Sequence, residues 1–92
     1  MKVLLVGNGG REHAIACALV RTSTPEQPVS LVVQAGNPAL EQLGRSLTMD
    51  PLDPKDVVRR ATSEKVDLVV VGPEAPLVAG VADAVLDYGM PV

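Results

Sequence analysis

The sequence has almost no aromatic side chains: one Tyr and no Phe or Trp among 92 residues. Proteins that bind single-stranded nucleic acids stack the bases on aromatic side chains, so this mode of binding is not expected. A net charge of −3 also leaves no basic surface that would attract a nucleic-acid backbone. The hydrophobic core must consist of Val, Leu, Ile and Ala, a composition typical of buried parallel strands covered by helices.

Cysteines and long apolar runs are equally scarce. The single cysteine, Cys17, excludes an internal disulfide and a cysteine-rich zinc site, and we interpret it as a small buried residue of a helix. No run approaches the ~20 apolar residues of a membrane-spanning helix. Lys2 is followed by a strand and a glycine-rich turn rather than by the apolar segment of a signal peptide. We therefore expect a cytoplasmic protein that binds neither a membrane nor a nucleic acid.

Short apolar runs alternate with helical patterns along the chain. The runs that predict strands cover 2–6, 29–33, 46–49 and 67–71. The patterns that predict helices cover 11–22, a short segment near Glu41, a segment capped by Asp53, and 75–89. This alternation predicts an α/β fold for residues 1–92: a small Rossmann-like open parallel sheet with helices on both faces.

The spacing of apolar residues predicts which face of each helix is buried. The expected buried faces consist of Ala14, Ile15, Ala18 and Leu19; of Val57, Val58 and Ala61; and of Leu77, Val78, Val81, Val85 and Leu86. The last three residues, MPV at 90–92, look like the start of a further strand, so we expect the chain to be part of a longer protein.

Segments rich in Gly and Pro follow three of the predicted strands: GNGG at 7–10, AGNP at 35–38 and GPEAP at 72–76. In open α/β sheets, ligands bind beyond the carboxyl ends of the strands. We therefore expect these segments to gather at one edge of the sheet and to form the ligand site.

The first of these segments differs from a dinucleotide-binding loop. The pattern G-x-G-x-x-G requires a third glycine where this chain has Glu12, and an acid near the end of the second strand, where it has Gln34 and Ala35. The lysine of a phosphate-binding loop is missing too, because no G-K-[ST] occurs. A nicotinamide cofactor is therefore not expected.

A glycine turn that opens a helix still favours an anion, because its backbone N–H groups are exposed. Gly9 and Gly10 allow a phosphate or carboxylate to approach closely, and Arg11 supplies charged donors. The alternative is that the two glycines only form a tight turn and that the Arg11 side chain is solvated.

Two further polar residues are candidates for the same edge. His13, on the first turn of the helix, either faces the site or hydrogen-bonds locally, and without other ligands nearby it makes no metal site. Glu74 lies between Pro73 and Pro76. Its carboxylate either accepts hydrogen bonds from sugar hydroxyls or an amine, or stabilises a helix N-terminus.

Read together, the stretches MKVLLVGNGGREHA, AGNP and VVVGPEAPLVAGVAD closely resemble the amino-terminal domain of the phosphoribosylamine–glycine ligase family, the glycinamide ribonucleotide synthetases of the ATP-grasp superfamily. The resemblance spans the whole chain, and the combination of GNGGREHA with GPEAPLV is highly specific. The family usually continues the second stretch as GNPGT, with a proline before it. Ala35, Ala39 and Leu40 depart from this pattern.

The resemblance implies a domain of the pre-ATP-grasp type on the substrate side of an enzyme that joins glycine to 5-phosphoribosylamine in de novo purine biosynthesis. ATP and magnesium would be held by ATP-grasp and carboxy-terminal domains absent from this chain, so residues 1–92 are expected to bind neither and to hold no catalytic residue. The expected partners are the two substrates and the remaining domains. The substrate-binding residues that the resemblance implies are Asn8, Gly9, Gly10, Arg11, His13, Gly36, Asn37, Pro38, Glu74 and Pro76.

A stand-alone module that binds a phosphosugar or nucleotide without catalysis is the alternative function. The two hypotheses predict different sequences beyond residue 92, because only the ligase requires a nucleotide clamp further along the chain. As part of the ligase, the 92 residues alone are expected to be inactive.

Overall fold

The computed structural model covers residues 1–92 and describes all of them except the side chain of Glu74. Its strands are β1 (Lys2–Val6), β2 (Ser30–Gln34), β3 (Arg45–Leu47) and β4 (Leu68–Val71). Its helices are α1 (Gly10–Arg21), α2 (Pro38–Glu41), α3 (Pro54–Ser63), α4 (Glu74–Val78) and α5 (Val81–Tyr88). None of the helices in this described part of the chain has the length and apolarity needed to cross a membrane.

All the strands are parallel and form one sheet in the order β3-β2-β1-β4, which confirms the predicted open parallel sheet. β1 is central, and its Leu4 lies opposite Val32 of β2 on one side and Val69 of β4 on the other. The chain first winds outward from β1 to β3 and then returns to the other side of β1 to form β4. This reversal places a topological switch point between β1 and β4, where open α/β sheets bind their ligands.

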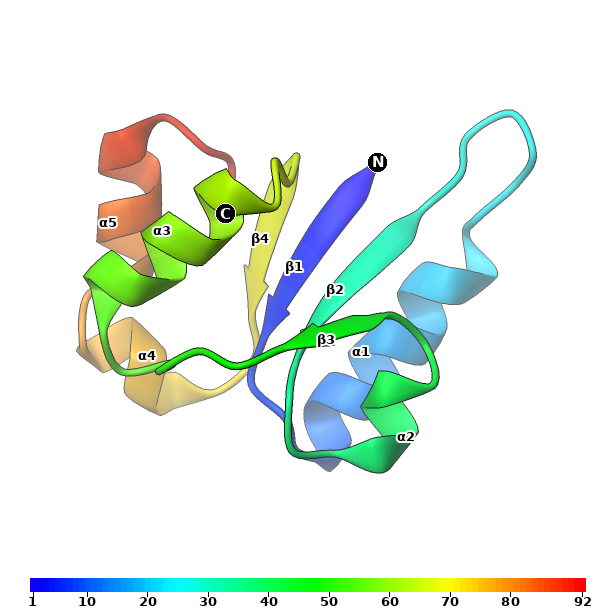
Figure 1. Ribbon diagram of the computed structural model, residues 1–92, viewed down its shortest axis with the longest axis horizontal. Helices are drawn as coiled ribbons and strands as arrows, with labels where there is room; N and C mark the ends of the chain where they lie inside the picture. Colours follow the sequence, from blue (N-terminus) through cyan, green and yellow to red (C-terminus); the bar gives the residue numbers. More distant parts are fainter.

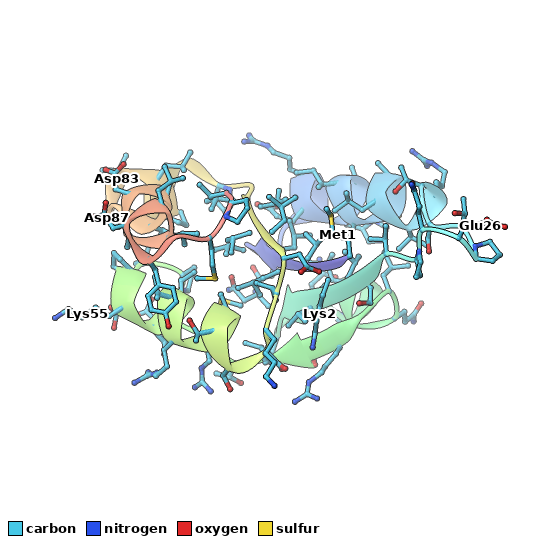
Figure 2. All side chains as sticks on the ribbon, turned by 90° about the horizontal axis from the view of Figure 1, so that it is seen from above. Met1, Lys2, Glu26, Lys55, Asp83 and Asp87 are labelled. Carbon is cyan, nitrogen blue, oxygen red and sulfur yellow. The ribbon has the colours of Figure 1, made fainter. Side chains whose placement is uncertain are left out.

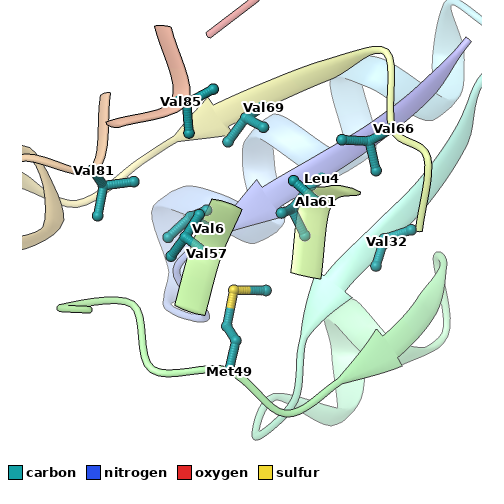
Figure 3. Close-up of a cluster of buried hydrophobic side chains, with 10 residues drawn as sticks. All are labelled: Leu4, Val6, Val32, Met49, Val57, Ala61, Val66, Val69, Val81 and Val85. Carbon is teal, nitrogen blue, oxygen red and sulfur yellow. The ribbon is translucent and has the colours of Figure 1, made fainter. Parts of the chain in front are cut away.

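Helices cover both faces of the sheet, as predicted, with α1 and α2 on one face and α3 and α5 on the other (Figure 1). Side chains alternate along β1, so Val3 and Leu5 belong to the cluster beneath α1 and α2. Leu4 and Val6 belong to the cluster beneath α3 and α5, which Met49 also joins (Figure 3). The buried residues of both clusters are Val, Leu, Ala and Met, as the shortage of aromatic residues requires.

The single helix predicted across 75–89 is in fact two helices. Gly80 has a φ of 93°, a left-handed conformation through which a right-handed helix cannot continue. The helical phase therefore restarts after Gly80, and α5 buries Val81 and Val85 as predicted. The prediction is wrong for three apolar side chains, which are exposed: Leu77, Val78 and Leu86.

The buried face of α1 also differs from the predicted one. Ile15 and Leu19 pack against the core, as expected. The remaining positions are wrong, because Ala14 and Ala18 are exposed whereas Glu12 and Ala16 are buried. Alanine contributes little to a hydrophobic pattern, and a buried glutamate runs against it, so helical spacing alone could not identify this face.

Residues 90–92 do not form the expected strand. The Val69 N–H nevertheless donates a hydrogen bond of 3.0 Å to the Pro91 carbonyl oxygen, so this segment lies beside the outer edge of β4. Proline has no N–H to donate in return, which prevents a regular ladder at this point.

Asp56, on the first turn of α3, is buried and ties that helix to the preceding loop. Its carboxylate accepts a hydrogen bond of 2.8 Å from the Asp50 N–H and pairs with Arg59 and Arg60. The Asp50 hydrogen bond, followed by the Arg59 hydrogen bond, holds the pKa of Asp56 below its usual value of 3.8. Because the pKa is lowered in the folded state, the stabilisation is complete above the unfolded pKa and is lost as the pH falls through the folded pKa.

We expect Asp56→Asn to lower the free energy of unfolding at pH 7 by about 1–3 kcal/mol, since it weakens hydrogen bonds to a charged group. Urea denaturation between pH 7 and pH 2 should show a smaller loss of stability in acid for the variant than for the unchanged chain. Asp87→Asn is the control, because Asp87 is exposed on α5 (Figure 2). An equal acid dependence for all three proteins would contradict this role of Asp56.

Candidate functional site

Two hollows lie at the carboxyl ends of the strands. The Arg11 hollow is lined by Gly10, Arg11, Glu12 and Pro73, and so lies at the switch point between the ends of β1 and β4. The Pro76 hollow is lined by Gly7, Asn8, Gly9, Glu12, Gln34, Pro51, Leu52, Pro73, Ala75 and Pro76. The lining thus comes from the segments after β1, β3 and β4 and from Gln34, the last residue of β2. The Pro51–Leu52 turn after β3 was not predicted from the sequence, and the predicted residues Gly36, Asn37 and Pro38 are not among the lining residues of either hollow.

Hydrogen bonds join the loop after β1 to the loop after β2. The Gly7 N–H donates to Gln34 Oε1 at 2.9 Å. Asn8 Nδ2 donates to the Ala35 carbonyl oxygen at 3.1 Å, and Asn37 Nδ2 donates to the Asn8 carbonyl oxygen at 2.9 Å. Gln34 stands where a dinucleotide site has its ribose-binding acid. Here its side chain accepts a hydrogen bond from the glycine turn instead.

The AGNP segment begins the short helix α2. Asn37 Oδ1 accepts a hydrogen bond of 3.0 Å from the Ala39 N–H, and Pro38 occupies the first turn, where no N–H donor is needed. Gly36 has a φ of 118°, and a Cβ there would lie 2.8 Å from Asn8 Nδ2. Leu40, one of the departures from the family pattern, is fully buried in the core. The departures therefore fit a short helix that packs on β2.

Gly10 and Arg11 face the Arg11 hollow from the start of α1. A Cβ at Gly10 would meet no atom within 4 Å, so a larger side chain at this position would occupy open space. Arg11 is exposed, and its Nη1 donates to the Gly72 carbonyl oxygen at 3.4 Å, across the switch point. Gly9 is the N-cap residue of α1, and the helix N–H groups beyond it point toward this edge.

Glu12, on the first turn of α1, lines both hollows. Its side chain is buried against the loop glycines, with a residue exposure of only 5%. The sequence analysis noted Glu12 only as the residue that replaces a third glycine. A glutamate where the dinucleotide-binding pattern has its third glycine was the only signal in the sequence that this side chain lies at the ligand edge.

His13 is not among the described residues that line the two hollows. Its Nε2 is 3.7 Å from Cys17 Sγ, one turn further along α1, which matches the local alternative considered for this histidine. Cys17 is half-buried, so the expectation of a buried residue is wrong. The small side chain only partly reaches the sheet because the buried stripe of α1 runs through its neighbour Ala16.

The loop after β4 brings Pro76 into the site. Pro76 is fully buried and lines the Pro76 hollow. The backbone of Glu74 begins α4, but its side chain lies outside the described residues, so its predicted role stays a prediction. Among the residues that the structure describes, no three His, Cys, Asp or Glu side chains are grouped as metal ligands would be.

These features define what the edge can bind. Helix N–H groups and the Arg11 guanidinium favour an anion at one side, and the Glu12 carboxylate favours a hydrogen-bond donor beside it. A small ligand that carries both a phosphate and amine or hydroxyl groups fits this pairing of charges.

Comparison with known proteins agrees with the sequence pattern. A family model described as "Phosphoribosylglycinamide synthetase, N domain" matches residues 1–92. Proteins named phosphoribosylamine–glycine ligase are 46% identical in Methanopyrus kandleri (99% of this chain, 20% of the relative), 45% in Streptomyces coelicolor (100% and 21%) and 43% in Escherichia coli O157:H7 (100% and 21%). The chain thus spans about a fifth of the length of these relatives.

The fold has a solved counterpart as well. The structure titled "Structure of glycinamide-RNase-transformylase T from Mycobacterium tuberculosis" superposes with a TM-score of 0.76, covering 99% of this chain and 28% of that one. The sequence identity is 19%, so this likeness concerns the fold alone.

Proposed function

The chain belongs to the phosphoribosylglycinamide synthetase N-domain family, and from this we propose that it is the substrate-side domain of a ligase of de novo purine biosynthesis. The ligase joins glycine to 5-phosphoribosylamine with hydrolysis of ATP. In this proposal the Arg11 hollow receives the phosphoribosylamine, and the activity requires further domains of the same polypeptide.

One observation carries the proposal: Gly10 and Arg11, at the start of α1, lie beside the loop after β4 and line the same hollow. Gly10 leaves open space beside the first N–H groups of α1, and Arg11 adds a guanidinium whose donors match a phosphate. A phosphate placed there lies at the switch point of the sheet, where α/β domains bind ligands. Of the other predicted residues, Asn8, Gly9 and Pro76 line the neighbouring Pro76 hollow. Gly36, Asn37 and Pro38 belong to the segment after β2, which is hydrogen-bonded to the Asn8 carbonyl oxygen through Asn37. The role predicted for Glu74 stays a prediction.

The described residues do not fit ATP or magnesium. The turn after β1 lacks the third glycine of a dinucleotide-binding loop, because Glu12 stands at that position. No P-loop lysine is present, and the described part of the chain offers no grouped metal ligands. We therefore assign the nucleotide and its metal to other domains of the ligase.

Titration of the 92-residue chain tests this assignment. We expect ribose 5-phosphate, a stable compound with the phosphate and ribose of the substrate, to shift the NMR amide signals of Gly9, Gly10 and Arg11. We expect NAD and ATP to show no micromolar affinity in calorimetry, because Glu12 replaces the third glycine and Gln34 replaces the ribose-binding acid. Micromolar binding of either nucleotide, or ribose 5-phosphate shifts confined to other regions, would contradict the proposal.

A further inference from the structure

The glycine turn between β1 and α1 has few side chains of its own to hold it in place. Gly9, the N-cap residue of α1, has no side chain to cap the first N–H groups of the helix. Gly7, at the start of the turn, has a φ of 109°. Two residues of high conformational freedom therefore flank Asn8, and the shape of the turn depends on contacts from outside it.

Asn37, in the segment after β2, supplies one of these contacts. Its Nδ2 donates a hydrogen bond of 2.9 Å to the Asn8 carbonyl oxygen, and its Oδ1 accepts one of 3.0 Å from the Ala39 N–H. Both partners are backbone groups whose roles as acceptor and donor are fixed, so the Asn37 amide fits in this orientation alone. One side chain thus caps α2 and holds the middle of the glycine turn.

The segment that carries Asn37 is itself anchored to the sheet. Pro38 occupies the first turn of α2, where its fixed φ suits the helix, and Leu40 is fully buried in the core. The same segment also holds the Asn8 side chain, because Asn8 Nδ2 donates to the Ala35 carbonyl oxygen at 3.1 Å. The position of Asn8 is therefore fixed through both its backbone and its side chain.

Asn37 lies next to the candidate site without forming its surface. It is not one of the described residues that line either hollow. Asn8, which it holds, lines the Pro76 hollow, and Gly10, two residues further on, lines the Arg11 hollow. A side chain in this place acts on a ligand by fixing the residues that bind it, and not by contact.

We infer that Asn37 is a positioning residue, which acts through Asn8 to hold Gly9, Gly10 and Arg11 in the geometry that binds the sugar phosphate. This inference rests on the proposed function and extends it to a residue outside the hollows. The resemblance implied direct binding of the substrate by Asn37, and the inferred role is indirect. A turn that is ordered before the ligand arrives binds more tightly, because less conformational entropy is lost on binding.

Asn37→Ser and Asn37→Asp separate the hydrogen bond to Asn8 from the capping of α2. Both variants keep an oxygen that caps the helix, and neither has a donor for the Asn8 carbonyl. We expect the Kd of the 92-residue chain for ribose 5-phosphate to rise about threefold to tenfold in both, as for the loss of one neutral hydrogen bond. The Kd is measured from the NMR amide signals of Gly9, Gly10 and Arg11. Serine is neutral and aspartate is charged, so an effect common to both variants is due to the missing donor.

Ala39→Gly is the matched control. Ala39 is exposed on α2, and glycine, the usual residue of the family here, lowers the helix propensity while the Asn37 side chain stays in place. Its Kd should stay within about twofold of that of the unchanged chain. Urea denaturation shows that each variant is folded.

An unchanged Kd in the folded Asn37 variants overturns the positioning role and leaves the proposed function intact. A Kd raised equally by Ala39→Gly also overturns it, because Asn37 would then act only through the stability of α2. If ribose 5-phosphate leaves these amide signals of the unchanged chain unaffected, the proposed function fails, and the positioning role with it.

Discussion

Gly7→Ala is expected to destabilise the domain by about 2–5 kcal/mol, the sum of the cost of a left-handed backbone and of overpacking. Gly7 has a φ of 109°, and its added Cβ would lie 2.6 Å from Glu12 Oε1 and 2.7 Å from the Pro73 ring. The total stability of a domain of this size is about 5–14 kcal/mol, so a substantial part of it would be lost. Two effects add at this position: an alanine would have to adopt the left-handed conformation, and its Cβ would collide with Glu12 and Pro73.

Gly80→Ala is the matched control for this substitution. Gly80 also has a left-handed conformation, with a φ of 93°, but a Cβ there would meet no atom within 4 Å. It should therefore cost only the backbone term, about 1–2 kcal/mol. The difference between the two variants in urea denaturation isolates the steric part. Equal losses would show that Glu12 and Pro73 do not pack against Gly7.

The hybrid ligase is one in which this chain replaces the matching segment of the Escherichia coli O157:H7 relative, 43% identical over 92 residues. In it, Arg11→Ala is expected to raise KM for 5-phosphoribosylamine about tenfold to hundredfold, while leaving KM for ATP nearly unchanged. The Arg11 side chain lines the Arg11 hollow beside the loop after β4, and its guanidinium provides charged donors for a phosphate. Because Arg11 is exposed and makes only a long hydrogen bond to Gly72, its removal should alter stability by less than about 0.5 kcal/mol. A large effect on binding without an effect on folding is the signature of a ligand-binding role.

β1, β2 and β4 could be predicted because each contains a short apolar run bounded by Gly, Pro or polar residues, whereas β3, with the sequence RSL, gave a weaker signal. β1 was placed without error, and β2 and β3 within one or two residues. Their parallel order followed from the alternation with helices, since parallel strands require such crossovers. The gathering of the Gly- and Pro-rich loops at one edge followed in turn, and it is confirmed by the hydrogen bond from Asn37 to Asn8.

The division of the last helix could not be predicted from apolar spacing. Gly80 is tolerated inside helices at modest cost, so its presence did not require a break. The left-handed conformation that it adopts depends on how α5 packs against α3, which is a tertiary interaction. For the same reason the exposure of Leu77 and Val78 was missed.

The position of the loops that form the candidate site was predicted from the sequence, but the charge distribution at this edge was not. The loop residues Gly9, Gly10 and Arg11 lie where the strand ends suggested. The burial of Glu12 depends on space left by Gly72, which is 60 positions away in the sequence. Only the fold brings these residues together, so the sequence pattern did not predict that Glu12 is buried between the two loops.

The decisive measurement for the proposed sugar-phosphate site is the kinetics of Arg11→Ala beside those of Arg21→Ala in the same hybrid ligase. Both residues are exposed arginines of α1, but Arg11 lies at the start of the helix and Arg21 is its last residue. The two ends of α1 lie near opposite edges of the sheet (Figure 1). We predict that KM for 5-phosphoribosylamine rises about tenfold to hundredfold for Arg11→Ala and stays unchanged for Arg21→Ala. Equal KM values for the two folded variants would contradict the claim that this edge of the sheet binds the sugar phosphate.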